Sequence, residues 1–178
     1  MVDINYLKDL VDVLIYEKKG LIIQGFSYFK EGKIEKILNF DDLLLFQPNF
    51  LRAFTEKKIE KYGYPFSKGY NRSIIENHKL RFDESIHYSE DLLFMLSYIQ
   101  YAEYIRFVSS SNYNYRRDMN IGLSHKYNSY ESEYSLYVQY KTIIHNLLKS
   151  EQKKICFFFM EKSDSDFREK LQEKIEFF

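Results

Sequence analysis

Two adjacent acids, Glu90 and Asp91, are the residues of this 178-residue chain best placed to do chemistry. They follow Ser89, a good helix N-cap, and precede an apolar run at helical spacing, so we expect them in the first turn of a buried helix. Acids at such a position stabilise the helix through its dipole, by roughly 0.3–1 kcal/mol each. The alternative is that one carboxylate acts as a general base and accepts a proton from an incoming hydroxyl.

A second group of candidates is Arg116 and Arg117, which follow a tyrosine-rich segment. Two arginines at the end of a strand could bind a phosphate or a carboxylate through paired hydrogen bonds, or could form a surface ion pair. The four histidines share no spacing typical of metal ligands, and the six glycines are scattered rather than gathered in a phosphate-binding loop.

Composition narrows the class of protein. The 26 basic and 26 acidic residues balance, which removes the electrostatic reason to expect nucleic-acid binding. The single cysteine, Cys156, excludes an internal disulfide framework and favours a cytoplasmic protein. The longest apolar run, at 155–160, is too short to span a bilayer, and the first residues do not resemble a signal peptide.

Periodicity predicts a chain that is α/β over its first two-thirds and helical over its last third. Helices are expected over 5–18, 41–62 with a break at Pro48, 72–77, a stretch that begins at Ser89, and the chain from 129 onward. Strands are expected over 21–28, with 34–38 as a hairpin partner, and over 104–108 and 111–116. Gly63 and Pro65 are expected to bracket a loop, and Leu80 and Phe82 to enter the core.

Three segments together, 67–84, 88–94 and 113–117, resemble the bacterial family 2 glycosyltransferases of surface-polysaccharide biosynthesis. They match in order and spacing a lysine-containing segment, an Arg-Phe-Asp-Glu stretch, a Glu-Asp helix start and a Tyr-x-Tyr-Arg strand. The resemblance implies an α/β, partial nucleotide-diphospho-sugar transferase-like (GT-A) fold with a helical C-terminal region. Residues 1–127 would form the C-terminal half of that domain and residues 128–178 a helical extension.

By this resemblance Asp91 matches the catalytic base, with Glu90 beside it, and Lys68 matches a substrate-binding lysine near the site. The carboxylate would deprotonate an acceptor hydroxyl as the hydroxyl attacks the anomeric carbon of a nucleotide-sugar donor.

The same resemblance places Arg116 and Arg117 toward the donor diphosphate. It also implies a divalent metal, Mn or Mg, for the full family fold, and leaves open whether this chain by itself holds the metal or holds none. Asn114 stands where the family often carries a metal-ligating histidine or tyrosine, and the nearby His125 is the substitute candidate.

The family's donor-binding half, with its Asp-x-Asp metal motif, should precede residue 1. We therefore expect that the chain acting alone does not turn over, and that it dimerises to cover apolar surface. Its expected partners are a nucleotide-sugar donor and a glycan acceptor, in the cytoplasm or, through peripheral association, at the inner face of the membrane. The alternative to an enzyme is a non-catalytic interaction or assembly module that retains the acceptor-half fold.

Overall fold

The computed structural model describes residues 2–15, 18–86, 88–116 and 129–148. The helices are α1 (Tyr6–Asp12), α2 (Leu51–Thr55), the 3-10 helix η1 (Ile59–Lys61), α3 (Arg72–Asn77), α4 (Glu90–Ile99) and α5 (Tyr130–Leu148). The strands are β1 (Gly20–Gln24), β2 (Phe26–Lys30), β3 (Lys33–Leu38), β4 (Leu43–Phe46), β5 (Lys68–Tyr70), β6 (Tyr104–Val108) and β7 (Asn114–Arg116).

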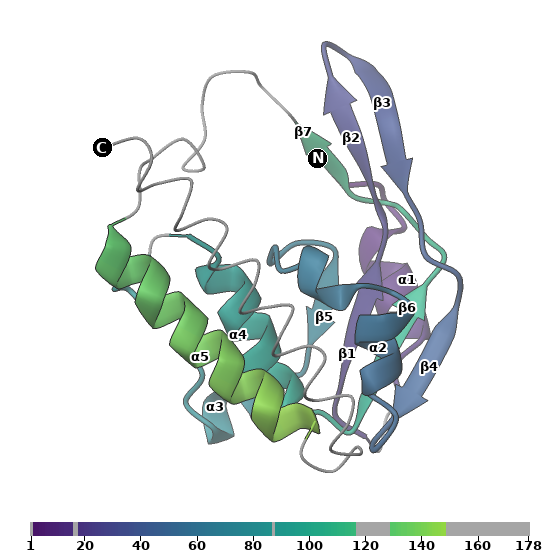
Figure 1. Ribbon diagram of the computed structural model, residues 1–178. Helices are drawn as coiled ribbons and strands as arrows, with labels where there is room; N and C mark the ends of the chain where they lie inside the picture. The colour runs from purple at the N-terminus through teal and green to yellow at the C-terminus, as the bar shows by residue number, and fades with distance from the viewer. Residues whose placement is uncertain (1, 16–17, 87, 117–128, 149–178) are drawn as a thin grey trace.

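The strands form two sheets, and the chain passes directly from β1 in the first sheet to β2 in the second. The first has the order β4-β6-β1-β5, with β1 and β6 parallel and the two outer strands antiparallel to their neighbours. The second has the order β3-β2-β7, with β2 and β7 parallel. Only Gly25 separates β1 from β2, and the β2–β3 hairpin projects beyond the first sheet (Figure 1). Gly25 donates its N–H to Ser110 O at 2.8 Å, and a Cβ added to it would lie 1.9 Å from Leu38 O.

Successive side chains of β1 point to opposite faces of the first sheet, and different helices pack on the two faces. Leu21 and Ile23 belong to the main core, which α4 and α5 complete on one face of the sheet. Ile22 belongs to a smaller cluster with Leu10 of α1 on the other face. Helices α4 and α5 lie side by side, and α1 lies beyond the sheet from them (Figure 1).

A buried hydroxyl ties α4 to the sheet and to α3. Tyr98 of α4 is fully buried, and its Oη donates to Gly20 O at 2.7 Å. The same oxygen accepts a hydrogen bond from Asn71 N, also at 2.7 Å. Asn71 is the N-cap of α3, so this hydroxyl fixes where β1, α3 and α4 meet.

Most predicted elements are confirmed, including the hairpin, the helix over 72–77, the helix that begins after Ser89 and the strand over 104–108. The first helix is shorter than predicted, and the single strand predicted over 21–28 is divided by Gly25 between the two sheets. The helix predicted from 41 is wrong at its start. Residues 43–46 are strand β4, which pairs with β6 from Leu43↔Phe107 to Phe46↔Tyr104.

Two packing expectations have mixed outcomes. Leu80 packs against the main core, whereas Phe82 is 46% exposed and stacks on Phe94 of α4 with 4.6 Å between ring centroids. The division at 127/128 stays a prediction, as does dimerisation. No helix in the described ranges is both long enough and apolar enough to cross a membrane.

Candidate functional site

Lys68 opens β5 and is the buried cation of the described core. It pairs with Ile23 near the carboxyl end of β1, and it is 7% exposed. Its Nζ donates to Tyr64 O and to Phe66 O, the latter at 3.5 Å, and lies 4.3 Å from the centroid of the Tyr64 ring. Burial lowers the pKa of Lys68 to about 7, while the negative charge of Asp91 opposes that shift.

Asp91 is the second residue of α4, where the chain turns into the helix. Ser89, at the N-cap position, has φ 60° and its side chain makes no capping hydrogen bond, so the expected serine cap does not form. The Oδ1 atom of Asp91 accepts a hydrogen bond from Leu92 N at 2.7 Å. Asp91 and Glu90 are both half-buried in the first turn, where the helix dipole favours negative charge.

Tyr70 completes the group and is the functional candidate that sequence reasoning missed. It lies two residues beyond Lys68 on β5, and its side chain packs edge-on against Phe94 and Tyr98 of α4. Burial raises the pKa of its phenol, and Tyr98 and Asp91 raise it further. Its buried Oη has no hydrogen-bond partner within the described part of the chain. An unpaired buried hydroxyl calls for an explanation, and a bound ligand that supplies the partner is one that suits the nearby charge of Asp91.

The location of these three side chains agrees with their chemistry. In open α/β sheets, ligands bind beyond the carboxyl ends of the parallel strands. Lys68 sits beside the next-to-last residue of β1, so the Lys68–Asp91 pair lies at this end of the sheet. Gln24 and Ser67 meet at the same end, where Gln24 N donates to Ser67 O at 3.0 Å. Each carries a buried side-chain polar atom with no partner among the described residues, Nε2 of Gln24 and Oγ of Ser67.

Not all of the remaining predicted site residues lie beside Lys68 and Asp91 in the described part of the chain. Arg116 is exposed on β7 in the second sheet, opposite Phe29 of β2. Arg117 and His125 lie outside the described residues, so their roles stay predictions. Within the ranges that the structure describes, no three His, Cys, Asp or Glu side chains gather as a metal site would require.

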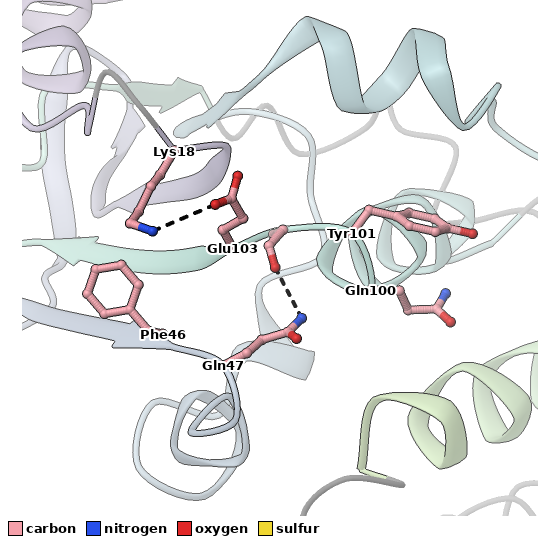
Figure 2. A pocket seen from close by; sticks show the side chains of 7 residues that line it. Lys18, Phe46, Gln47, Gln100, Tyr101 and Glu103 are labelled. Carbon is pink, nitrogen blue, oxygen red and sulfur yellow. Dashed lines mark hydrogen bonds and ion pairs between the residues drawn. The ribbon is translucent and has the colours of Figure 1, made fainter.

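An open cavity of about 650 Å³ is lined by seven residues, six of which are labelled in Figure 2. It lies at the opposite end of the sheet from Lys68, because its lining residues lie before β1 and β6 or at the end of β4. The lining residues include Lys18, Phe46 and Glu103. The Lys18–Glu103 pair spans 3.8 Å with both side chains 47% exposed, so it contributes little energy. Gln47 Nε2 donates to Ala102 O at 3.1 Å and is already satisfied. Because this cavity lies at the amino ends of the parallel strands and none of its lining residues has an unpaired buried polar atom, Lys68 and Asp91 remain the candidate functional site.

The comparisons with known proteins rest on structure. No protein-family model matches the chain, and no curated protein matches its sequence. A solved structure that does match is Staphylococcus aureus TarS, residues 1–349, in complex with UDP-GlcNAc. The TM-score is 0.62 at 17% identity, over 96% of this chain and 44% of that chain. The fold is glycosyltransferase-like.

This likeness confirms the predicted α/β glycosyltransferase-like fold. Because the sequence identity is only 17%, it carries no information on activity or ligands. The narrower GT-A and family 2 assignments stay predictions. The chain spans less than half the length of the TarS fragment, so activity, substrates and partners are proposals for this chain.

Proposed function

We propose that this protein takes part in glycosyl transfer from a nucleotide-sugar donor to a glycan acceptor, with Asp91 as the general base. The observation that carries the proposal is that α4 packs against β5 at the carboxyl end of β1, through the contacts of Tyr70 with Phe94 and Tyr98. This packing brings Asp91 within range for its charge to act on the buried Lys68, in a glycosyltransferase-like fold. TarS is complexed with UDP-GlcNAc, which makes a UDP-sugar the first donor to test.

In the proposed step, a carboxylate oxygen of Asp91 removes the proton of an acceptor hydroxyl. The hydroxyl oxygen forms a bond to the anomeric carbon of the donor sugar, and the bond from that carbon to the diphosphate oxygen breaks. The electron pair leaves with the nucleoside diphosphate, and the proton stays on Asp91 until solvent removes it. A base positioned in this way contributes about 10²–10⁴-fold to a rate.

Lys68 would act here by position and charge. Its ammonium donates to two carbonyls of the 64–66 segment, so it ties this segment to the start of β5. Its charge is adjustable near neutral pH because burial lowers its pKa to about 7. The described residues do not fit a metal site, so no step is routed through Mn or Mg, and the resemblance-based expectation of a divalent metal stays a prediction.

The test measures UDP release from UDP-sugars in the presence of glycan acceptors, with the protein as its gene encodes it. Asp91→Asn should lower the rate by about 10²–10⁴-fold, as expected for loss of a general base. The matched control is Asp12→Asn, an exposed acid at the end of α1, beyond the sheet, which should leave the rate unchanged. Glu90→Gln should lower the transfer rate less than Asp91→Asn does. Transfer that survives Asp91→Asn would refute the assignment of Asp91 as the base. Because the chain acting alone is not expected to turn over, the assay is run on the whole gene product.

A further inference from the structure

Six aromatic rings form one continuous cluster next to the Lys68–Asp91 pair, and we call it the aromatic stack. Its members are Phe26 and Tyr28 of β2, Tyr113 and Tyr115 at β7, and Tyr64 and Phe66 of the segment between η1 and β5. Their positions alternate along three separate segments, so each segment directs its rings to one side. The stack therefore joins the second sheet to the segment that leads into the functional site.

Part of the stack is layered in parallel. The ring of Tyr64 lies on that of Phe66 with 4.4 Å between centroids and 10° between planes. Phe66 in turn lies on Tyr113 at 4.6 Å and 11°, and on Tyr115 at 4.9 Å and 16°. Tyr28 meets Tyr115 edge-on at 6.0 Å and 90°, from the directly opposite position in the β2–β7 pairing. These contacts hold the orientation of Tyr115 from two sides.

The stack is buried at one end and open at the other. Phe26 is 1% exposed, whereas Tyr115 is 38% exposed on β7, which is an edge strand of its sheet. A fixed, partly exposed tyrosine offers apolar ring surface at little entropic cost on binding, together with a hydroxyl that can donate or accept a hydrogen bond.

The stack is continuous with the proposed reaction site. Lys68 Nζ lies 4.3 Å from the centroid of the Tyr64 ring, and the rings continue from Tyr64 through Phe66 to Tyr115. The same Nζ donates to the carbonyl oxygens of Tyr64 and Phe66, so Lys68 helps to position the segment that carries these two rings.

We propose that the exposed end of the aromatic stack, centred on Tyr115, binds a neutral pyranose ring of the glycan acceptor. The inference rests on the proposed function and adds the place and the chemistry of acceptor binding. One face of a pyranose ring carries C–H groups with partial positive charge, which match the negative face of an aromatic ring, while its hydroxyls reach polar atoms at the rim. A nucleobase also stacks on aromatic rings, so the experiment has to separate the two ligands.

The experiment measures binding rather than transfer. Three neutral trisaccharides, built of N-acetylglucosamine, glucose or galactose, and UDP as a separate probe are titrated against the protein by saturation-transfer difference NMR. At least one trisaccharide should bind with a Kd in the millimolar range or tighter, with the strongest transfer to its ring C–H protons. Tyr115→Ile keeps a strand-forming apolar residue but removes the ring, and it should weaken that binding about tenfold.

Tyr115→Phe should retain most of the affinity, since the ring remains. Tyr101→Ala is the matched control, because Tyr101 is a 43% exposed tyrosine in the cavity at the other end of the sheet. These titrations report binding and involve no transfer, so a failure of the proposed base and a failure of this site give different results. The proposal is overturned if no trisaccharide binds, if Tyr115→Ile leaves the affinity unchanged, or if Tyr115→Ile weakens UDP and not the sugars.

Discussion

Lys68 makes a quantitative prediction, because the fold disfavours its charged form. The pKa of this lysine falls from 10.5 to about 7 on folding, with burial as the main cause. Between these two pH values the unfolded chain binds a proton at Lys68 that the folded chain does not. The free energy of unfolding therefore rises with pH through this window, and the contribution of Lys68 is least favourable below pH 7.

The magnitude follows from 1.36 kcal/mol per pH unit. Over the full window from about 7 to 10.5 the change is about 5 kcal/mol, and over the accessible range from pH 6 to 9 it is about 2.7 kcal/mol. Because Lys68 is only 7% exposed, solvent screening reduces this value little.

Urea unfolding of the unaltered protein and of Lys68→Met at pH 6 and pH 9 isolates the effect. The free energy of unfolding of the unaltered protein minus that of Lys68→Met should rise by about 2.7 kcal/mol between the two pH values. Lys8→Met, an exposed lysine of α1, is the control, and its difference should stay constant. A change below about 0.5 kcal/mol for Lys68→Met would refute the reasoning, because that lies within the error of extrapolation.

Three further predictions concern the same region. Asp91→Asn should lower the pKa of Lys68 further, since the Asp91 charge is what opposes the effect of burial, and NMR titration of the Lys68 Cε resonances measures the change. Gly63→Ala should destabilise the fold by about 1–3 kcal/mol, because the added Cβ would lie 2.6–3.0 Å from the first turn of α4, whereas Gly69→Ala meets atoms only at 3.6 Å or beyond and should be tolerated; thermal unfolding compares the two. Tyr98→Phe should cost about 1–3 kcal/mol in urea unfolding, because it leaves a buried carbonyl of β1 and a half-buried N–H at the start of α3 without their hydroxyl partner. An unchanged stability would contradict that role.

Secondary structure was predicted best where the sequence contains both a helix N-terminal signal and apolar residues at helical spacing. Ser89 followed by two acids and an apolar face predicted α4 correctly, although the serine marks the start by position and not by a side-chain bond. The stretch 43–46 was misread because four apolar residues fit a helix or a strand equally well, and only the long-range pairing with β6 decides between them.

The candidate site was also predictable only in part, because each residue motif is visible in the sequence but their proximity in the fold is not. Lys68 and Asp91 were found as separate motifs 23 positions apart along the chain, and the structure brings their charges together. Tyr70 and the aromatic stack were missed, although the aromatic side chains at 62, 64, 66 and 70 alternate in step with Lys68. The loop expected around Gly63 and Pro65 is confirmed, since no helix or strand lies between η1 and β5, and a period of two is not expected inside a loop.

The junction at Gly25 limits how the length of this chain can vary in evolution. Gly25 is the single residue between β1 and β2, so it sets which side chains of β2 face each side of the second sheet. Insertion or deletion of one residue there would move every side chain of β2 to the opposite face. Phe26 and Tyr28 would then leave the aromatic stack, and Ser27 and Phe29 would take their places. Homologous proteins should therefore differ in length at the β2–β3 turn or between β4 and α2, while the single-residue spacing between β1 and β2 stays invariant.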